Sequence, residues 1–484
     1  MRFLAERPAH DLTYSDVFLV PSRSAVRSRL EVDLAPTDGT GASIPIVSAN
    51  MNSVTGPRLA ATLARRGGLG VLPQDLPVDE LAAAVRGVKA QPVLWDAPLE
   101  LPESATASEA LALLPPAEGY GILLRDASGA EAGFLPAPRL AHALPDARLG
   151  DLVHLETPSL DADELDRAAA GPARAAFDRI ARGGHELALV RRGPELLGTV
   201  SRRGALRGTL YRPALDDAGR LRVGAALGIN RDVAAHAREL AAAGVDVLVM
   251  DTAHGHQEGM LRALETVAGL GLGIPLVAGN VVTADGVRDL VAAGAGIVKV
   301  GVGPGAMCTT RMMTAVGRPQ FGAVLETAET ASGLGAHVWA DGGVRYPRDV
   351  ALALAAGAAS VMIGSWFAGT IEAPGRLETD AQGRVFKQSW GMASTKAVHA
   401  RFAGLDAYEL ARKELFAEGI SSSAIYLDPL RPSLEDLLDM ITAGVRSSFT
   451  YAGAADLAAF HERAVVGVQS AAGYEEGKAL PVSW

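Results

Sequence analysis

The sequence contains only one cysteine, Cys308, no apolar run of the roughly 18 residues that a membrane-spanning helix needs, and fewer basic than acidic side chains. One cysteine cannot form an internal disulfide, and the first residues, MRFLAERPAH, lack the apolar core of a signal peptide. The 45 Lys and Arg residues against 55 Asp and Glu give a net charge of −10, which argues against an extended basic surface for nucleic acid. We therefore expect a cytoplasmic protein with no membrane and no nucleic-acid partner.

The length of 484 residues exceeds one ordinary domain, since domains run at roughly 100 to 200 residues and single α/β barrels at about 250. Hydrophobic residues make up 49% of the chain and charged residues 21%, which is typical of a folded protein with a large core. Two structural units are therefore expected.

Short apolar runs alternate with Ala- and Leu-rich helical segments along most of the chain. Continuous apolar strands that alternate with helices indicate a parallel sheet covered on both faces, and eight such units favour a (β/α)8 TIM barrel over an open sheet. The predicted strands are IPIVSAN (44–50), LGVLP (69–73), RVGAALG (222–228), VDVLVMDT (245–252), PLVAGN (275–280), IVKVGVG (297–303), HVWADGG (337–343) and SVMIGS (360–365).

The polar or glycine residues that close these strands are expected to share one location. In a barrel of this kind the carboxyl ends of all strands meet at one mouth, where active sites lie. The residues placed there are Asn50, Asp251, Asn280, Gly303, Asp341 and Ser365.

The spacing between the second and third predicted strands is too long for one helix, so residues 92–213 are predicted to be an inserted domain between barrel parts 1–91 and 214–484. Its segments 121–140 and 187–206 share a strand, turn, strand, helix rhythm. This pair resembles tandem CBS modules, which commonly bind adenine or guanine nucleotides such as ATP or GTP. A spacer or assembly role is the alternative, because Arg139 and Gly204 stand where nucleotide-binding copies usually carry a ribose-binding aspartate.

The residues after the eighth strand include a Gly- and Ser-containing stretch, 381–430, that predicts a mobile flap over the barrel mouth. The next helix is predicted over 433–453, with Ser433 as N-cap. The tail after Gly473 is expected to be poorly ordered.

The single cysteine lies in the loop after the sixth strand, within GVGPGAMCTTRMM (301–313). Taken alone, a free cysteine is more often a buried, inert residue. This one is preceded by three glycines and flanked by Thr309, Thr310 and Arg311, and nearby positive charge favours a thiolate. At the mouth of a barrel such a residue is a candidate nucleophile for an electrophilic carbon.

The loops after the seventh and eighth strands form the usual phosphate site of a barrel. Asp341 cannot hold a phosphate, so it is expected to accept hydrogen bonds from ribose hydroxyls, while the donors to the phosphate come from Gly342, Gly343, Gly364 and Ser365. The alternative for these glycines is tight strand-to-helix packing. A ribose phosphate beside a thiol implies a nucleotide attacked at its base.

The motifs as a whole resemble the IMP dehydrogenase/GMP reductase superfamily, whose active-site loop usually reads GIGPGSxCTTR. The resemblance extends from LTYSDVFLVPSRS (12–24) through SANMNSVT (48–55), MDTAHGH (250–256), AGNVVTA (278–284), GRPQ (317–320), ADGGVRYPRD (340–349) and GSWFAG (364–369) to WGMAS (390–394) and AEG (417–419). Many dehydrogenases of this family carry a CBS pair at the same place.

The resemblance leaves the direction of the reaction to a few positions. Family dehydrogenases activate water with an Arg-Tyr pair on the flap, and here Ala407 precedes Tyr408, while Arg401 and Arg412 are out of register. The stretch SWGMAS (389–394) and the N-terminal SRSAVRSRLEVDL (22–34) also lean towards the reductases, whereas DTAHGH, GVRYPRD and the insertion are dehydrogenase-like. The leading expectation is NADPH-dependent reduction of GMP to IMP and ammonia. The alternatives are an IMP dehydrogenase that uses NAD, and a non-catalytic nucleotide sensor.

The resemblance also implies roles for individual residues. Cys308 would form the adduct with purine C2, with Thr310 and Glu418 moving protons, although Glu418 has the rival role of holding purine N1–H. The purine edge would be read by Gly391, Met392 and Ala393, and Met51 and Asn280 would line the base and cofactor side. Nicotinamide ribose and carboxamide would be placed by Asp251, Gly301 and Gly303.

Further expectations from the family concern ions and assembly. Carbonyl groups of Gly303, Gly305 and Cys308 could hold a monovalent cation such as K+, and family barrels form tetramers, sometimes octamers. Ala306 replaces a serine that usually donates to the phosphate, and Asn52 replaces an aspartate. His254 and His256 predict no zinc site, because no third ligand is in view.

Overall fold

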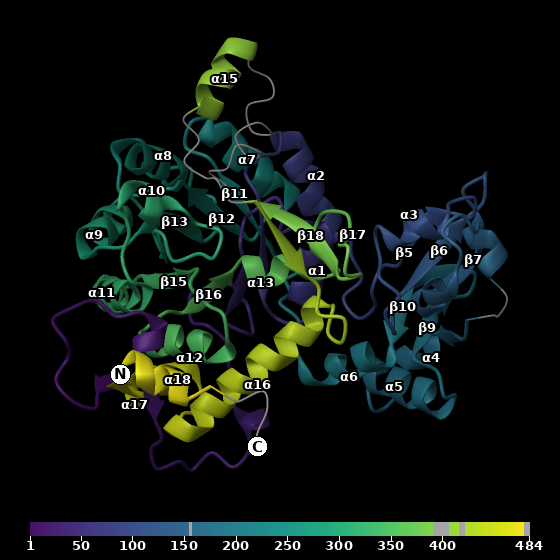
Figure 1. The fold of residues 1–484 in the computed structure, drawn as a ribbon, viewed down its shortest axis with the longest axis horizontal. Helices are drawn as coiled ribbons and strands as arrows, with labels where there is room; N and C mark the ends of the chain where they lie inside the picture. The colour runs from purple at the N-terminus through teal and green to yellow at the C-terminus, as the bar shows by residue number, and fades with distance from the viewer. Residues whose placement is uncertain (154–156, 391–405, 416–421, 479–484) are drawn as a thin grey trace.

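A closed parallel barrel of eight strands forms the centre of the protein (Figure 1) in the computed structural model, which describes residues 1–153, 157–390, 406–415 and 422–478. The strands lie where the apolar runs predicted them, so the predicted TIM-barrel fold is confirmed. In chain order they are β3 (Ile46–Ser48), β4 (Leu69–Leu72), β11 (Val223–Leu227), β12 (Val247–Asp251), β13 (Leu276–Val281), β14 (Ile297–Val300), β15 (His337–Asp341) and β16 (Ser360–Ile363). Pairing of β16 with β3 and of β4 with β11 closes the ring.

The interior of the barrel is filled by apolar side chains from all eight strands, among them Val247, Ile297, Trp339 and Met362. Trp339 is fully buried, and its indole N–H donates to the Asp38 carboxylate at 2.8 Å. Close packing of this kind makes the barrel a solid core rather than a pore. Polar side chains that lie at the carboxyl ends of the strands therefore surround the mouth, not a channel.

Helices cover the outside of the barrel, one after each strand. They are amphipathic or Ala-rich, and their buried faces pack against the strands in one continuous core. The covering helices are α1 (Pro57–Arg65), α2 (Val78–Lys89), α7 (Val233–Ala243), α8 (Glu258–Ala268), α9 (Ala284–Ala292), α11 (Gln320–Gly333), α12 (Pro347–Ala355) and α16 (Leu434–Ala452), with the short α10 (Thr310–Thr314) and α13 (Ser365–Ala368) in loops at the mouth.

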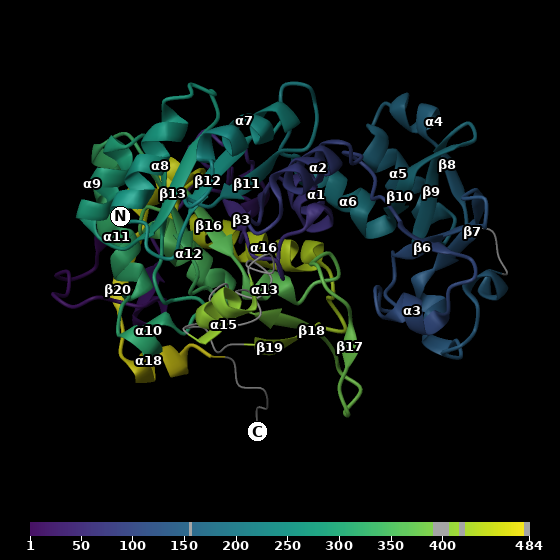
Figure 2. The same ribbon diagram turned by 90° about the horizontal axis from the view of Figure 1, so that it is seen from above.

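The predicted internal repeat appears as two small sheets beside the barrel (Figure 2). In each sheet the first strand is parallel to the second and the second is antiparallel to the third. The first has β5 (Leu99–Pro102), β6 (Gly121–Arg125) and β7 (Glu131–Pro136) with α3 (Ala107–Leu111), η3 (Ala137–His142) and η4 (Leu149–Leu152); the second has β8 (Ser159–Asp161), β9 (Leu187–Arg192) and β10 (Glu195–Ser201) with α4 (Ala162–Asp166), α5 (Pro172–Arg182) and α6 (Arg202–Leu210). Their assignment as CBS modules and the boundaries at 92 and 213 stay predictions.

The segment after the barrel forms a third small sheet, β17 (Glu378–Thr379), β18 (Val385–Trp390) and β19 (Ser422–Tyr426), all antiparallel. Between β18 and β19, helix α15 (Ala407–Leu415) projects from the body (Figure 1). The apolar core of the first inserted sheet includes Ile371, Leu377 and Leu427 from this region. The base of the predicted flap therefore packs against the insertion.

The two ends of the chain meet in a sheet ordered β1 (Arg2–Phe3), β20 (Val465–Val468), β2 (Val17–Val20), flanked by η1 (Tyr14–Asp16), η2 (Arg29–Glu31) and α17 (Leu457–Arg463). A poorly ordered tail was expected after Gly473, but the chain is helical up to Glu476, where α18 (Ala471–Glu476) ends. The expectation was wrong for these residues. Ser470 caps this helix by accepting from the Gly473 N–H, and the Arg348 guanidinium lies 5.2 Å from the centroid of the Tyr474 ring.

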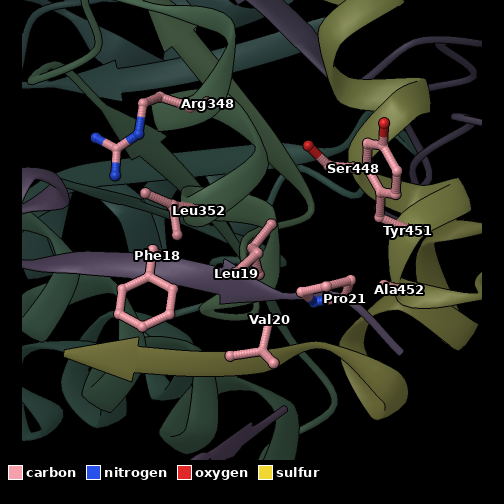
Figure 3. A pocket seen from close by; sticks show the side chains of 9 residues that line it. All are labelled: Phe18, Leu19, Val20, Pro21, Arg348, Leu352, Ser448, Tyr451 and Ala452. Carbon is pink, nitrogen blue, oxygen red and sulfur yellow. The ribbon is translucent and has the colours of Figure 1, made fainter. Parts of the chain in front are cut away.

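A cavity of 350 Å³ lies on the outer side of the barrel, between β2, α12 and α16 (Figure 3). Its wall is largely apolar. The charged side chain in the wall, Arg348, donates to the backbone oxygens of Tyr14 and Val17 at 3.1 and 2.6 Å. No predicted site residue lines it. No helix in the described part of the chain combines the length and apolarity needed to cross a membrane.

Candidate active site

The Cys308 thiol is exposed, so it is not the buried residue that a free cysteine more often is. Its loop follows β14, the sixth barrel strand, and turns through a hydrogen bond from the Cys308 N–H to the Gly305 carbonyl at 2.9 Å. The Sγ atom lies 3.3 Å from Oγ1 of Thr310, the first residue of α10. The structure therefore brings the predicted nucleophile and one predicted proton-transfer residue together at the mouth.

Gly301 allows the loop to start directly against the neighbouring strand. Its φ is +151°, and a Cβ built there would lie 2.2 Å from the backbone oxygen of Asp341. A larger residue would push the sixth and seventh loops apart. Gly301 thus allows the cysteine loop to lie beside Asp341. The packing requires a glycine here, in addition to the cofactor contact that was predicted for it.

The strand ends carry a connected group of charged and amide side chains centred on Lys299. The Lys299 ammonium lies 2.8 Å from Oδ1 of Asp251 and 2.9 Å from Oδ2 of Asp341, and it also donates to Oδ1 of Asn280. Asn50 donates to the other oxygen of Asp251 at 3.0 Å. Four of the predicted mouth residues are therefore joined through one lysine that sequence reasoning missed.

Burial and pairing act in opposite directions on this lysine. Its side chain is 4% exposed, and burial alone would lower its pKa, but the Asp251 and Asp341 carboxylates outweigh burial and hold the pKa of Lys299 above its ordinary value. The ammonium is therefore charged at neutral pH. The signal in the sequence was a single charged residue inside the run IVKV (297–300), whose other residues are all apolar.

The predicted anion site is formed by the loops after β15 and β16, the seventh and eighth barrel strands. Gly342 has φ +88°, and a Cβ there would lie 3.2 Å from the Gly305 N–H nitrogen, so this loop packs on the cysteine loop. Gly364 precedes the short helix α13, which starts at Ser365. This is the usual phosphate-binding arrangement of the fold. A Cβ on Gly364 would lie 3.4 Å from the Met51 sulfur, which places Met51 beside it.

Several predicted residues lie outside the described part of the chain, namely Gly391, Met392, Ala393 and Glu418. The strand that leads to them ends at Trp390, and the hydroxyl of Ser389 lies 3.0 Å from that of Ser53, in the loop after β3. Ala407 and Tyr408 begin α15 and are exposed. The Arg412 guanidinium lies 6.0 Å from the Tyr408 ring centroid and pairs with Glu409 at 3.0 Å.

Asn52 has a structural explanation that the sequence alone did not provide. Its amide donates to the Asp75 carboxylate at 3.0 Å. An aspartate at position 52 would place two carboxylates together and raise the cost of ionising both. His256 pairs with Asp289 at 2.6 Å, and the described residues hold no cluster of three or more potential metal ligands from His, Cys, Asp and Glu.

An exposed thiol, glycine-containing loops and two carboxylates paired with a lysine at the carboxyl end of a parallel barrel define a TIM-barrel enzyme with a candidate nucleophilic cysteine. Comparison with known proteins identifies its family. A family model described as the IMP dehydrogenase / GMP reductase domain matches residues 11–479. The chain belongs to this family and is an oxidoreductase.

The similar proteins include both branches of the family. GMP reductases of Mycobacterium tuberculosis and Mycobacterium bovis are 52% identical over 486 residues, covering 100% of this chain and of each relative. An inosine-5'-monophosphate dehydrogenase of Aquifex aeolicus is 36% identical over 96% of this chain and 94% of its own. A crystal structure of GMP reductase from Trypanosoma brucei in complex with guanosine 5'-monophosphate has a TM-score of 0.68 and 29% identity, and it covers 98% of this chain and 99% of that one.

Proposed function

We propose that this protein is a GMP reductase, which converts GMP and NADPH to IMP, ammonia and NADP. The observation that carries the proposal is the 52% identity over the full length of both chains to GMP reductases, against 36% to a dehydrogenase. The exposed Ala407 next to Tyr408 supports it, since the arginine of the water-activating pair is replaced by a methyl group.

The proposed reaction uses the thiol and its neighbours in a fixed order. The Cys308 sulfur forms a bond to C2 of the purine, and the 2-amino group leaves as ammonia after protonation by the pair Thr310 and Glu418. NADPH, when bound, would supply the hydride that adds to C2. The carbon–sulfur bond then breaks, and the thiolate leaves IMP. The 3.3 Å contact between Cys308 and Thr310 places the Thr310 hydroxyl beside the attacking sulfur, which supports its role in protonating the amino group that leaves.

The nucleotide and the cofactor would be held by the residues of the mouth. Asp341 would accept from the ribose hydroxyls, and Gly342, Gly343, Gly364 and Ser365 would donate to the phosphate. The purine edge would be read by Gly391, Met392 and Ala393, with Met51 beside the base. Asp251, Asn280, Gly301 and Gly303 would face the nicotinamide ribose and carboxamide.

Further features of the proposal concern a cation, the insertion and assembly. A monovalent cation such as K+ would sit on carbonyl groups of Gly303, Gly305 and Cys308. The insertion would bind ATP or GTP, although Arg139 and Gly204 offer no carboxylate for a ribose. The protein would assemble as a tetramer or octamer, as in its family.

One observation favours a second candidate function, IMP dehydrogenase. Arg412 lies one helical turn after Tyr408 with its guanidinium 6.0 Å from the ring, so an arginine and a tyrosine do share one face of α15. However, Arg412 already forms an ion pair with Glu409, which competes with a role in activating water.

A paired assay separates the two functions. The protein is incubated with GMP plus NADPH in one reaction and with IMP plus NAD in another, and absorbance at the nicotinamide band is followed in both. We expect NADPH consumption in the first and negligible NADH formation in the second, with both absent in Cys308→Ala. Rapid NADH formation from IMP would instead assign the protein to the dehydrogenases.

A further inference from the structure

The Lys299 side chain touches residues expected to bind the nucleotide and residues expected to bind the cofactor. An ammonium group has three donors and no acceptor. Its three contacts go to Asp251, Asp341 and Asn280, one for each donor. The group is therefore saturated by protein acceptors, which rules out a role in binding substrate directly.

The contacts of Lys299 leave one oxygen of Asp341 available. Oδ2 of Asp341 accepts from Lys299 at 2.9 Å and from the Asn280 amide at 3.0 Å, while no described residue donates to Oδ1. Lys299 occupies Oδ1 of Asp251, and the other oxygen of that carboxylate faces Asn50. Asp341 is thus held through one oxygen and Asp251 through both, which fixes the rotation of each carboxylate, and both are partly exposed, Asp251 at 17% and Asp341 at 21%.

A purely stabilising role does not explain this arrangement. The strand side chains deeper in the barrel are apolar, and a buried ion pair is often no more stable than well-packed apolar residues of similar volume. A charged lysine at the mouth does hold two carboxylates in fixed rotations in which they can accept further hydrogen bonds. Hydroxyl groups of a sugar are the donors that such acceptors select.

We infer that Lys299 is a positioning residue that aims Asp341 and Asp251 at the two ribose rings, and that it thereby sets the selectivity for ribonucleotides over their deoxy analogues. The inference rests on the proposed function, because Asp341 is assigned to the ribose of GMP there. Without Lys299 the two carboxylates would repel each other and rotate apart. The catalytic efficiency would then depend little on whether a ribose hydroxyl is present in the substrate.

The test compares GMP with 2'-deoxy-GMP and 3'-deoxy-GMP as substrates of the wild-type protein and of Lys299→Met. We expect the wild type to prefer GMP over at least one deoxy analogue by about tenfold or more in kcat/KM, since a lost hydrogen bond to a charged acceptor is worth that much. In Lys299→Met this preference should fall to about twofold or less, and KM for NADPH should rise about tenfold.

The chain offers a matched control at the opposite end of the barrel. Lys89 is equally buried and pairs with Asp216 at 2.9 Å and Asp246 at 2.6 Å, next to the start of β12. Lys89→Met removes the same kind of group, so it should lower thermal stability yet keep the preference for GMP. If Lys299→Met does not fold, Lys299→Gln gives the same comparison, because the amide fits the space and carries no charge.

The outcomes separate this inference from the proposed function. A folded Lys299 variant that keeps the wild-type preference for GMP over the deoxy analogues would overturn the positioning role. A wild-type protein that turns over GMP without any such preference would overturn it as well. Absence of GMP turnover in the wild type would instead contradict the proposed function, and a calorimetric comparison of GMP and 2'-deoxy-GMP binding would then decide on Lys299.

Discussion

Replacing Arg207 with methionine should loosen the insertion from the barrel. Arg207 belongs to α6, the last helix of the insertion, and its side chain is 7% exposed. It lies 2.9 Å from Glu435, 2.6 Å from Asp436 and 2.8 Å from Asp439, all at the start of α16. These carboxylates outweigh the cost of burial and raise the pKa of Arg207.

The magnitude follows from what the substitution leaves behind. Removing one partner of a buried ion pair costs about 3 to 5 kcal/mol, because the other charges stay buried without compensation. Arg66 still pairs with Glu435 at 2.5 Å, so we expect the lower end, about 3 kcal/mol. Such a loss raises the population of the opened contact roughly a hundredfold, since each 1.4 kcal/mol is about a factor of ten.

Hydrogen exchange followed by mass spectrometry measures this opening locally, which suits a chain of several units better than one global midpoint. Amides of α6 and of the first turns of α16 should exchange roughly a hundredfold faster in Arg207→Met. Arg203→Met is the control, because Arg203 pairs with the same Asp436 at 3.0 Å but is 62% exposed, so the change should stay below about 1 kcal/mol. Equal exchange in both variants, or none beyond wild type in Arg207→Met, would refute the reasoning.

Three further predictions concern the flap, the mouth and the flap base. Ala407→Arg places an arginine directly before Tyr408, and we expect it to increase XMP formation from IMP plus NAD relative to wild type, with Ala407→Met as an uncharged control. Gly342→Ala should raise KM for GMP about tenfold while KM for NADPH changes little, because φ of +88° disfavours alanine and its Cβ would lie 3.2 Å from the Gly305 nitrogen. Burial lowers the pKa of Lys387 to about 8 despite the attraction of Glu372. Lysine in the unfolded chain keeps its proton up to about pH 10. Between about pH 8 and pH 10 the unfolded state therefore binds more protons than the folded state, and the contribution of this residue makes the free energy of unfolding rise with pH. Thermal midpoints measured across that window should rise less in Lys387→Met than in wild type; an unchanged slope would contradict the assignment.

The barrel could be predicted from the sequence because each strand is a local signal. A buried parallel strand is apolar on both faces, so runs such as VDVLVMDT (245–252) contain the observed strand Val247–Asp251 with its polar end. The helix predicted over 433–453 is Leu434–Ala452, capped by Ser433, which accepts from the Asp436 N–H. These features depend on residues that are neighbours in the chain.

The features that were missed depend on pairings between distant residues. Lys299 has its partners at 251 and 341, and Arg207 has its partners beyond position 430, so neither pairing leaves a local pattern. The predicted flap was not expected to contain strands, yet β18 pairs with β19, and the two are separated in the chain by helix α15. Such contacts follow from the fold and become visible only when the fold is known.

The release of labelled ammonia tests the central claim most directly. GMP that carries ¹⁵N in its 2-amino group is incubated with the protein and NADPH, and labelled ammonia, IMP and oxidised cofactor are quantified together. The proposed function predicts one labelled ammonia and one IMP for each NADPH oxidised, and none of the three in Cys308→Ala. NADPH oxidation without labelled ammonia, or retention of the label on the purine product, would contradict it.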